Sequence, residues 1–417
     1  MSGSDAGRRP RRSGRHSAEL PARLDPRRGY RGRHLSTAGS RARLLGKLTA
    51  AALSVAVLAV SGVAWGTYRS AVGNITHLSV LPPAGNNPGK SDVDGSDQNI
   101  LIVGDDSRNG LTAAQLAKVA TQDDGGGVNT DTMMVVHLPA DGSKATAVSL
   151  PRDLWVDVPG HGHNKLNAAF SIGSNGNTDN ASRTAGFRLL IQTVAGVTGL
   201  HIDHFVEVNL WGFYSISEAI GGIDVNLCHA VNDPYSGVNL PAGHSVLKGT
   251  QALAFVRQRH GLVNGDLDRE RRQQYFIGAV FRKVQSAGVL LNPIRLNDLL
   301  NAVTKVLTTD PGLDPIKLVD QMRGLTAGNL KFSTIPISGM PVIDGQDVIT
   351  YDPATVHAMF ATLTHPKPAA TPKPTSTASA TPTAKSTKSS GGHTATKTPT
   401  ATATPTARSA ADRSCIN

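Results

Sequence analysis

Cysteine is scarce in this sequence: only Cys228 and Cys415 occur among 417 residues. That number excludes a framework of several disulfides and a metal site built from thiolates. Because Cys415 lies near the end of a stretch of low complexity, we do not expect the two cysteines to pair, although a bridge formed outside the cell stays open as the alternative. The sequence also lacks an internal repeat and an obvious pair of Ser or Cys nucleophile and His base.

A basic surface on the folded part is lacking as well, although the whole chain has a net charge of +11. Residues 1–47 hold 13 basic and 3 acidic residues, and residues 367–417 hold 7 and 1, which leaves 22 basic and 27 acidic residues in 48–366. A nucleic-acid-binding domain would carry its positive charge on the fold itself. We therefore expect no nucleic-acid partner, and we interpret clustered arginines within the acidic part as a local site.

One long stretch contains no charged residue: residues 48–68 read LTAAALSVAVLAVSGVAWGTY. About 20 such residues span a bilayer as one helix. Basic residues from Arg41 to Lys47 precede it, so the positive-inside rule places the N-terminus in the cytoplasm and the chain after Arg69 outside the cell. The alternative is a cleaved signal peptide, which needs a shorter apolar core. We predict an uncleaved, single-pass anchor in the cell membrane.

Composition divides the chain into five predicted parts. They are a disordered basic arm (1–47), a transmembrane helix (48–68), a turn-rich linker (69–96), one extracytoplasmic domain (97–365) and a disordered tail rich in Thr, Pro and Ala (366–417). The tail has almost no large apolar residues and cannot bury a core. In an exported protein such a tail suits a wall-spanning or O-glycosylated stalk, and a solubilising tail is equally consistent with it.

Apolar runs and helical spacings alternate along the domain. We expect strands at 98–104, 132–138, 144–150, 204–210, 223–225 and 331–335, and helices at 184–200, 214–220, 248–256 and 269–287. Strands that alternate with helices indicate an α/β domain, here a layered mixed β-sheet flanked by helices.

Arginines and aspartates gather in VRQRH and GDLDRERRQQ, between residues 255 and 275. They are Arg257, Arg259, Arg269, Arg271, Arg272, Asp266 and Asp268. An extended chain sends Arg257 and Arg259 to the same face, and Asp266 is placed to cap the helix that follows. Gathered guanidinium groups suit an anion with several oxygens, such as a diphosphate. The alternative is a solvated helix start with Asp–Arg pairs.

Acidic and basic residues also follow the ends of three predicted strands. They are Asp105, Asp106 and Arg108 in the first loop, Asp131 at the second strand, and Arg152 and Asp153 in the third. Ligand sites in α/β sheets gather at strand ends, so these loops are expected to meet. Two carboxylates among oxygen ligands would hold Mg²⁺ or Mn²⁺. A turn or capping role remains the alternative for any single one.

These pieces, in this order, resemble the LytR–CpsA–Psr family of membrane-anchored cell-wall glycopolymer transferases over residues 97–365. The motifs that carry the resemblance are LIVGDDSR (101–108), NTDTMMVVHL (129–138), VSLPRDLWV (148–156), KLNAAF (165–170), HFVEVNL (204–210), GGIDV (221–225), LKGTQALAFVRQR (247–259) and DLDRERRQQ (266–274). Two positions depart from the family pattern. Asp105 replaces a small neutral residue, which leaves the choice between Asp105 and Asp106 as metal ligand open, and Asn129 stands where an arginine is frequent.

The resemblance implies an extracytoplasmic phosphotransferase that passes a sugar phosphate from a polyprenyl-diphosphate carrier to a hydroxyl of peptidoglycan. It implies Mg²⁺ or Mn²⁺ held by Asp106 and Asp131. The residues it implies for catalysis are Asp106, Asp131, Arg257, Arg259 and Arg269. Those it implies for contacts with the diphosphate are Arg108, Arg152, Lys165, Asn167, Asp266, Arg272 and Gln273. The implied partners are the polyprenyl-diphosphate-linked glycan, peptidoglycan and membrane lipid.

The family also implies an apolar tunnel for the prenyl chain. Residues we expect to line it are Phe170, Phe187, Leu190, Val194, Phe205, Trp211, Phe276 and Val280, with ordinary core packing as the alternative for each. Two other functions stay open. One is a polyprenyl-diphosphate hydrolase with water as acceptor, and the other is a non-catalytic wall-binding or regulatory protein. His161, His163 and His260 are weaker candidates for a general base than an aspartate beside the metal.

Overall fold

The computed structural model of this chain describes residues 75–82, 97–108, 111–119, 130–286, 301–364 and 407–417, with isolated positions at 54, 66, 69, 73 and 299. The chain divides into two units, Met1–Trp65 and Gly66–Asn417, and all described residues except Ser54 belong to the second. Among the described residues, no helix has the length and apolar character needed to cross a membrane. The predicted arm, nearly all of the predicted membrane span, and most of the linker and tail lie outside the described residues.

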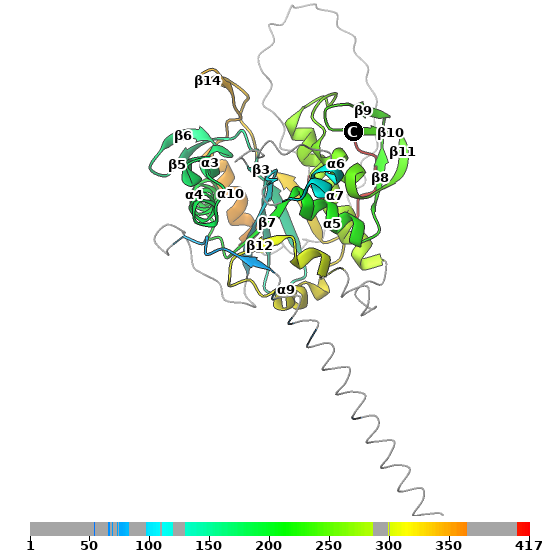
Figure 1. Ribbon diagram of the computed structural model, residues 1–417. Coiled ribbons are helices and arrows are strands. Elements are labelled where there is room, and N and C mark those ends of the chain that lie inside the picture. Colours follow the sequence, from blue (N-terminus) through cyan, green and yellow to red (C-terminus); the bar gives the residue numbers. More distant parts are fainter. Residues whose placement is uncertain are drawn as a thin grey trace, which may run out of the picture. The chain divides into compact units, whose positions relative to one another are not determined.

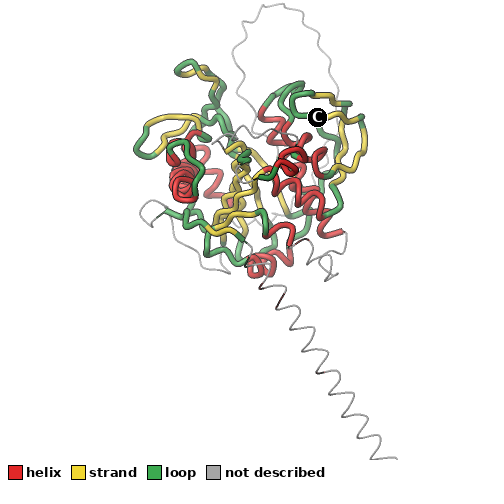
Figure 2. The backbone as a smooth tube through the Cα atoms, viewed as in Figure 1, coloured by secondary structure: helices red, strands yellow, loops and turns green. Residues whose placement is uncertain are grey.

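In the part of the chain that the structure describes, an eight-stranded mixed sheet lies at the centre (Figures 1 and 2). Its strands, in spatial order, are β1 (Thr76–His77), β12 (Leu307–Thr309), β7 (His204–Asn209), β2 (Gln98–Asp105), β3 (Thr130–Leu138), β4 (Ala145–Ser149), β13 (Leu330–Thr334) and β16 (Arg408–Ser409). Strand β2 pairs antiparallel with β3 and parallel with β7, and β4 pairs parallel with β13. The predicted class, a layered mixed sheet flanked by helices, is confirmed.

One face of the sheet is covered by three helices, α3 (Ala168–Ser174), α4 (Asn180–Thr198) and α10 (Pro353–Thr364) (Figure 1). The hairpin of β5 (Trp155–Val158) and β6 (Gly162–Lys165) lies beside them. Val103 and Val135 from the sheet belong to the same buried cluster as Phe187 and Leu190 of α4. Each of these four side chains is buried, so this face of the sheet forms part of the hydrophobic core.

The other face carries α5 (Leu210–Ala219), α6 (Gly249–Arg257) and α7 (Asp266–Ser286) (Figure 1). Two hairpins extend this side, β8 (Ile223–Leu227) with β11 (Gly243–Leu247), and β9 (Val231–Asp233) with β10 (Val238–Leu240). The remaining short elements are α2 (Ala113–Lys118), α9 (Pro315–Gln321), a 3₁₀ helix (Met322–Gly324), β14 (Val342–Ile343) and β15 (Gln346–Asp347).

Most predicted elements are present, with shifted ends where a polar side chain caps a helix. The predicted strand 204–210 ends at Asn209, whose side chain accepts a hydrogen bond of 2.8 Å from the backbone N–H of Gly212 and so starts α5 four residues earlier than expected. Helix α7 begins at Asp266 and not at 269. Asp266 is thus the first helical residue, and its carboxylate serves neighbouring arginines.

The end of the chain corrects one expectation. Residues 407–417 join the domain: β16 pairs antiparallel with β13, and Ala410 and Ile416 are buried. Cys228 and Cys415 form a disulfide, which was not expected. The prediction extended the low-complexity stretch to the end of the chain, although the composition of the sequence changes at Arg408.

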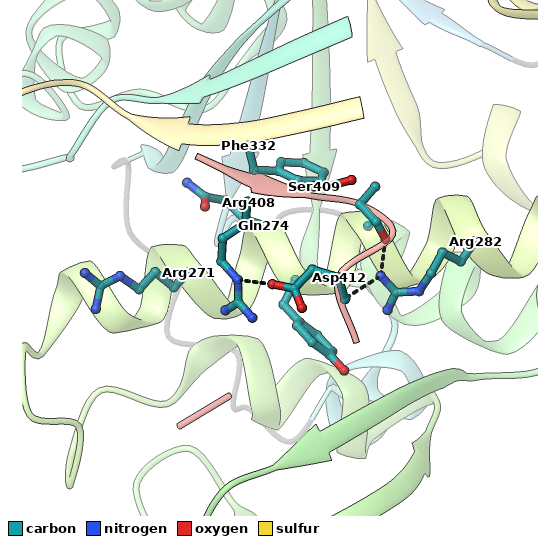
Figure 3. A pocket seen from close by; sticks show the side chains of 10 residues that line it. Arg271, Gln274, Arg282, Phe332, Arg408, Ser409 and Asp412 are labelled. Carbon is teal, nitrogen blue, oxygen red and sulfur yellow. Dashed lines mark hydrogen bonds and ion pairs between the residues drawn. The ribbon is translucent and has the colours of Figure 1, made fainter. Parts of the chain in front are cut away.

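Helix α7 holds the same segment by polar contacts (Figure 3). Arg282 donates hydrogen bonds to the backbone oxygens of Ala410 and Asp412, the second at 3.2 Å. Arg408 forms an ion pair of 2.9 Å with Asp412, which holds the turn after β16. The C-terminal segment is therefore a strand, a turn and a disulfide on the domain and not part of a disordered tail.

Candidate active site

A cavity of about 590 Å³ opens between the sheet and helices α5, α6 and α7. Strand alternation decides which side chains reach it: Val206 and Val208 of β7 line the cavity, while the neighbouring Phe205 packs into the core on the opposite face. Further apolar lining comes from Phe213, Ile216, Leu253, Phe276, Val280, Val303 and Leu307. Polar lining comes from Asp105, Asp106, Asp131, Arg257, Arg259, His260, Arg269 and Gln273. An apolar cavity with a few converging polar groups is typical of a ligand site.

Asp131 at the start of β3 lies at the centre of the charged lining. Its Oδ1 accepts a hydrogen bond of 2.6 Å from Arg152, and its Oδ2 accepts one of 3.0 Å from Arg259. Arg269 donates to the backbone oxygen of Asp131 at 3.2 Å. Burial alone would raise the pKa of Asp131, but the three guanidinium groups outweigh it and lower that pKa. Asp131 therefore stays ionised and holds three arginines together.

Asp266 completes this network from the first turn of α7. Its carboxylate forms ion pairs of 2.7 Å with Arg269 and 3.0 Å with Arg152, and a longer one of 3.5 Å with Arg259. Two carboxylates thus hold the same three guanidinium groups from different sides. Such pre-organisation leaves the arginines less freedom to lose when an anion binds.

Asp106 and Arg257 also belong to the charged lining but are less engaged. Burial and the negative charge of Asp131 raise the pKa of Asp106, although nearby arginines act in the opposite direction. Among the described residues, Oδ1 of Asp106 is buried without a hydrogen-bond partner. Arg257 is near Asp106, Asp131 and the like charge of Arg108, yet it forms no ion pair with a described carboxylate. Asp106 can therefore bind a cation, and Arg257 can bind an anion.

Asp105 faces a different environment from its neighbour Asp106. It is buried, and its Oδ1 accepts a hydrogen bond from the backbone N–H of Ser107. Burial and the adjacent carboxyl of Glu207 raise the pKa of Asp105 well above its ordinary value. Glu207 is itself paired with Arg183 of α4 at 2.5 Å. Both carboxyl groups line the cavity, but Asp105 interacts with Glu207 while Asp106 interacts with Asp131 and the cavity arginines, which favours Asp106 as the carboxylate that meets a ligand.

Arg272 was expected to contact the diphosphate, but its side chain is fully buried and does not line the cavity. Its guanidinium donates to Oε1 of Gln258 at 2.5 Å and to the backbone oxygen of Asn417 at 2.8 Å, and it lies 4.7 Å over the ring of Phe255. Burial lowers the pKa of Arg272 to about 10. Its neighbour Gln273 does line the cavity. Arg272 therefore supports the segment that bears the cavity arginines.

Besides Arg272, five expected contacts lie outside the cavity lining: Arg108, Arg152, Lys165, Asn167 and Asp266. Lys165 forms an ion pair of 3.0 Å with Asp153, which also lies 3.5 Å from Arg152. Asn167 precedes α3 without a side-chain capping bond, and its backbone N–H donates to the oxygen of Arg152 at 3.0 Å. Arg108, at the loop after β2, interacts electrostatically with Asp106. Lys165 and Asn167 thus lie near Arg152, and neither of them lines the cavity.

The sequence model of the LytR_cpsA_psr family matches residues 83–365. The chain belongs to the LytR–CpsA–Psr family. The cell wall biosynthesis protein LcpA of Corynebacterium glutamicum is 37% identical over 332 residues, which are 74% of this chain and 63% of LcpA. TagU of Oceanobacillus iheyensis, a polyisoprenyl-teichoic acid–peptidoglycan teichoic acid transferase, is 30% identical over 241 residues, 58% of this chain and 67% of TagU. The chain thus spans less than two thirds of LcpA.

Solved structures share the fold. The LytR-Csp2A-Psr enzyme from Actinomyces oris superposes with a TM-score of 0.51 at 20% identity, covering 69% of this chain and 96% of that one. TagV of Bacillus subtilis superposes with a TM-score of 0.50 at 22% identity, covering 64% and 96%. The mixed sheet between two helical layers is therefore the fold of the family.

Most of the residues expected to line an apolar tunnel do not line the cavity, because they lie on the opposite face of the sheet. Of the eight apolar residues expected there, Phe276 and Val280 line it. Phe170, Phe187, Leu190, Val194 and Phe205 belong to the packed core beneath α3 and α4. Trp211 stacks on Tyr214 at 5.0 Å outside the lining. Both helical layers are apolar, so hydrophobicity alone does not tell which layer leaves a space.

Sequence reasoning also missed polar residues of the lining. Asp233, Tyr235 and Ser236 reach the cavity from the β9–β10 hairpin, which carries none of the family motifs. The pattern Asp-Pro-Tyr-Ser-Gly at 233–237 is a turn signal and would have indicated an exposed tyrosine. Nothing in the sequence would have brought that turn to the arginine cluster.

Proposed function

We propose that this chain is a membrane-anchored, extracytoplasmic phosphotransferase that moves a glycopolymer from a polyprenyl-diphosphate carrier to peptidoglycan. The observation that carries the proposal is the convergence of Arg257, Arg259 and Arg269 on one apolar cavity, around the ionised Asp131. A diphosphate joined to a long hydrocarbon chain needs both a charged lining for the phosphates and an apolar lining for the chain. The name of TagU, which includes teichoic acid and peptidoglycan, supports the same class of donor and acceptor.

The apolar lining would hold the prenyl chain. Its volume of about 590 Å³ lies within the range of about 300–1,000 Å³ of ligand pockets. Burying apolar carrier surface contributes about 25 cal/mol per Å². Residues 48–68, nearly all of which lie outside the described residues, would anchor the chain in the membrane that holds the carrier, with the N-terminus in the cytoplasm. Peptidoglycan and membrane lipid would be its neighbours outside.

The charged lining would bind the diphosphate. Arg257 forms no ion pair with a described carboxylate and is free to take a phosphate oxygen. Arg259 and Arg269 are held by Asp131 and Asp266 in positions from which their remaining N–H groups can donate. Hydrogen bonds between guanidinium and phosphate are charge-assisted and often bidentate.

The cavity carboxylates fit a hard divalent cation such as Mg²⁺ or Mn²⁺. The buried Oδ1 of Asp106 has no hydrogen-bond partner among the described residues, and Asp106 and Asp131 repel each other. Two carboxylates together with phosphate oxygens form the oxygen donor set that these ions prefer. When bound, the ion would neutralise negative charge on the diphosphate.

In the proposed reaction, the acceptor hydroxyl oxygen forms a bond to the phosphorus that bears the sugar. The bond between that phosphorus and the bridging oxygen breaks, and polyprenyl phosphate leaves with the bridging oxygen. A cavity carboxylate takes the hydroxyl proton. Arg257, Arg259 and Arg269 stabilise the charge that develops on the leaving phosphate, which is a sufficient role for the protein in phosphoryl transfer.

The test measures transfer and release separately. The full chain in lipid vesicles receives a polyprenyl-diphosphate-linked glycan, with and without peptidoglycan oligomers, and both attached glycan and free polyprenyl phosphate are quantified. We expect Arg257→Ala with Arg259→Ala to lower transfer by about a hundredfold or more. The matched control is Arg271→Ala on α7, whose partly exposed side chain pairs with Asp268 outside the cavity.

Each outcome assigns a function. Lipid phosphate released at the same rate without peptidoglycan would make the chain a hydrolase. Wall-polymer attachment in cells that persists in the double arginine variant would favour a non-catalytic wall-binding protein. Activity that survives a chelator without loss would argue against the divalent cation.

A further inference from the structure

An exposed aromatic side chain lies at the opening of the cavity. Tyr235, at the tip of the β9–β10 hairpin, lines the cavity although 81% of its surface is exposed. Its ring centroid is 4.2 Å from that of His260, which also lines the cavity. An exposed tyrosine contributes little to the core, and aromatic surface beside a cavity is typical of a binding contact.

The backbone at both rings is held by hydrogen bonds within its own loop. Oδ1 of Asp233 accepts a hydrogen bond of 3.0 Å from the backbone N–H of Tyr235, and the oxygen of Asp233 accepts one of 2.9 Å from Gly237. The backbone oxygen of His260 accepts a hydrogen bond of 2.8 Å from Gln258. The Nδ1 of His260 lies 3.9 Å from the buried carboxylate of Asp233, so the two loops are adjacent at this point. Two loops with ordered backbone therefore present the two rings side by side, which limits the backbone freedom lost when a ligand binds.

The pair also borders the charged lining. His260 directly follows Arg259, whose guanidinium donates to Asp131 at 3.0 Å. In the substrate of the proposed function, the group joined to the diphosphate on the side away from the prenyl chain is a sugar. A pyranose ring has an apolar C–H face that packs on an aromatic ring, and it has hydroxyls that pair with a phenol or imidazole at its edge.

We infer that Tyr235 and His260 form a stacking platform for a pyranose ring of the glycan. The inference rests on the proposed function and adds to it the residues that recognise sugar. The ring belongs either to the sugar next to the diphosphate of the donor or to the peptidoglycan acceptor. The chemistry is the same in both cases, so the experiment distinguishes the two.

Steady-state transfer is measured for the full chain while donor and acceptor are varied separately. We expect Tyr235→Ala to raise one KM by about tenfold and to change kcat by less than about threefold, because stacking on the ring is lost. Tyr235→Phe keeps the ring and should stay within about twofold of the wild type. A raised donor KM places the ring in the donor, and a raised acceptor KM places it in peptidoglycan. Val263→Ala is the control, since Val263 is 90% exposed on the same loop as His260 but does not line the cavity.

A binding measurement keeps this inference separate from the proposed function. Peptidoglycan oligosaccharides, and a water-soluble disaccharide diphosphate with a short prenyl chain, are titrated calorimetrically into the wild type and Tyr235→Ala. If the wild type transfers nothing but Tyr235→Ala binds one probe about tenfold more weakly, the platform stands and the proposed function fails. Equal KM and equal binding in the two proteins, or a loss in Tyr235→Phe as large as in Tyr235→Ala, overturns the platform.

Discussion

Glu270 is a carboxyl group enclosed in the core beside the cavity arginines. Burial and the negative charge of Asp266 raise the pKa of Glu270 to about 8, from an ordinary value of 4.5. Between these values the folded protein keeps a proton on Glu270 that the unfolded chain releases. The stability contributed by the uncharged carboxyl is complete below pH 4.5 and is lost as the pH rises towards about 8.

We expect Glu270→Gln to remove this dependence, because a glutamine stays uncharged at every pH. The free energy of unfolding of the wild type, relative to the variant, should fall by up to about 1.4 kcal/mol per pH unit within that window. Urea unfolding of both proteins from about pH 5 to about pH 8 measures the difference. Glu218→Gln, at a partly exposed position on α5, is the control. Parallel stability curves for wild type and Glu270→Gln would contradict the assignment.

At the scale of elements, the end of α6 positions the cavity arginines, and the buried side chain of Gln258 fixes the backbone there. Gln258 lies between Arg257 and Arg259, and its side chain accepts from Arg272 of α7 and donates to the backbone of His260. One side chain thus joins two helices and fixes the direction in which the chain leaves α6. Its neighbours Arg257 and Arg259 can then reach the cavity from the last residue of α6 and from two residues beyond it.

We expect Gln258→Leu to lower kcat/KM by about tenfold or more and to lower stability by about 2–4 kcal/mol, because Arg272 loses a partner for its buried charge. Kinetics and urea unfolding measure the two effects. Gln251→Leu, at an exposed position of the same helix, serves for comparison. Since Gln258 does not line the cavity, unchanged catalysis in a destabilised variant would limit it to a role in the fold.

Strand and helix periodicity predicted these elements well, because each element is amphipathic over several residues. The same pattern predicted that Arg257 and Arg259 lie at the end of α6 and that Asp131 lies at the start of β3. The sequence could not separate Arg272 from Arg269, which lie three residues apart on α7 but face a buried backbone oxygen and the cavity, respectively. It also could not tell which helical layer leaves a cavity, because that depends on how side chains from distant segments fill the space.

At the scale of the whole molecule, the segment after the low-complexity stretch packs on the helical layer that carries the cavity arginines. Arg272 donates to the oxygen of Asn417, and Cys415 is joined to Cys228 at the end of β8. Ile416 is buried in the same cluster as Phe255 and Phe276. The segment therefore adds to the layer of α6 and α7 that carries the cavity arginines, and residues 366–406 connect two points of one domain.

The disulfide should contribute much of the stability of this arrangement. We expect Cys228→Ser with Cys415→Ser to lower the free energy of unfolding by about 3–5 kcal/mol, because the bridge joins residues 187 positions apart and restricts the unfolded chain. Urea unfolding with and without a reducing agent measures this. The reducing agent should destabilise the wild type and leave the double serine variant unchanged. A wild type whose unfolding curve is the same in both conditions would mean that the bridge does not hold the segment on the domain.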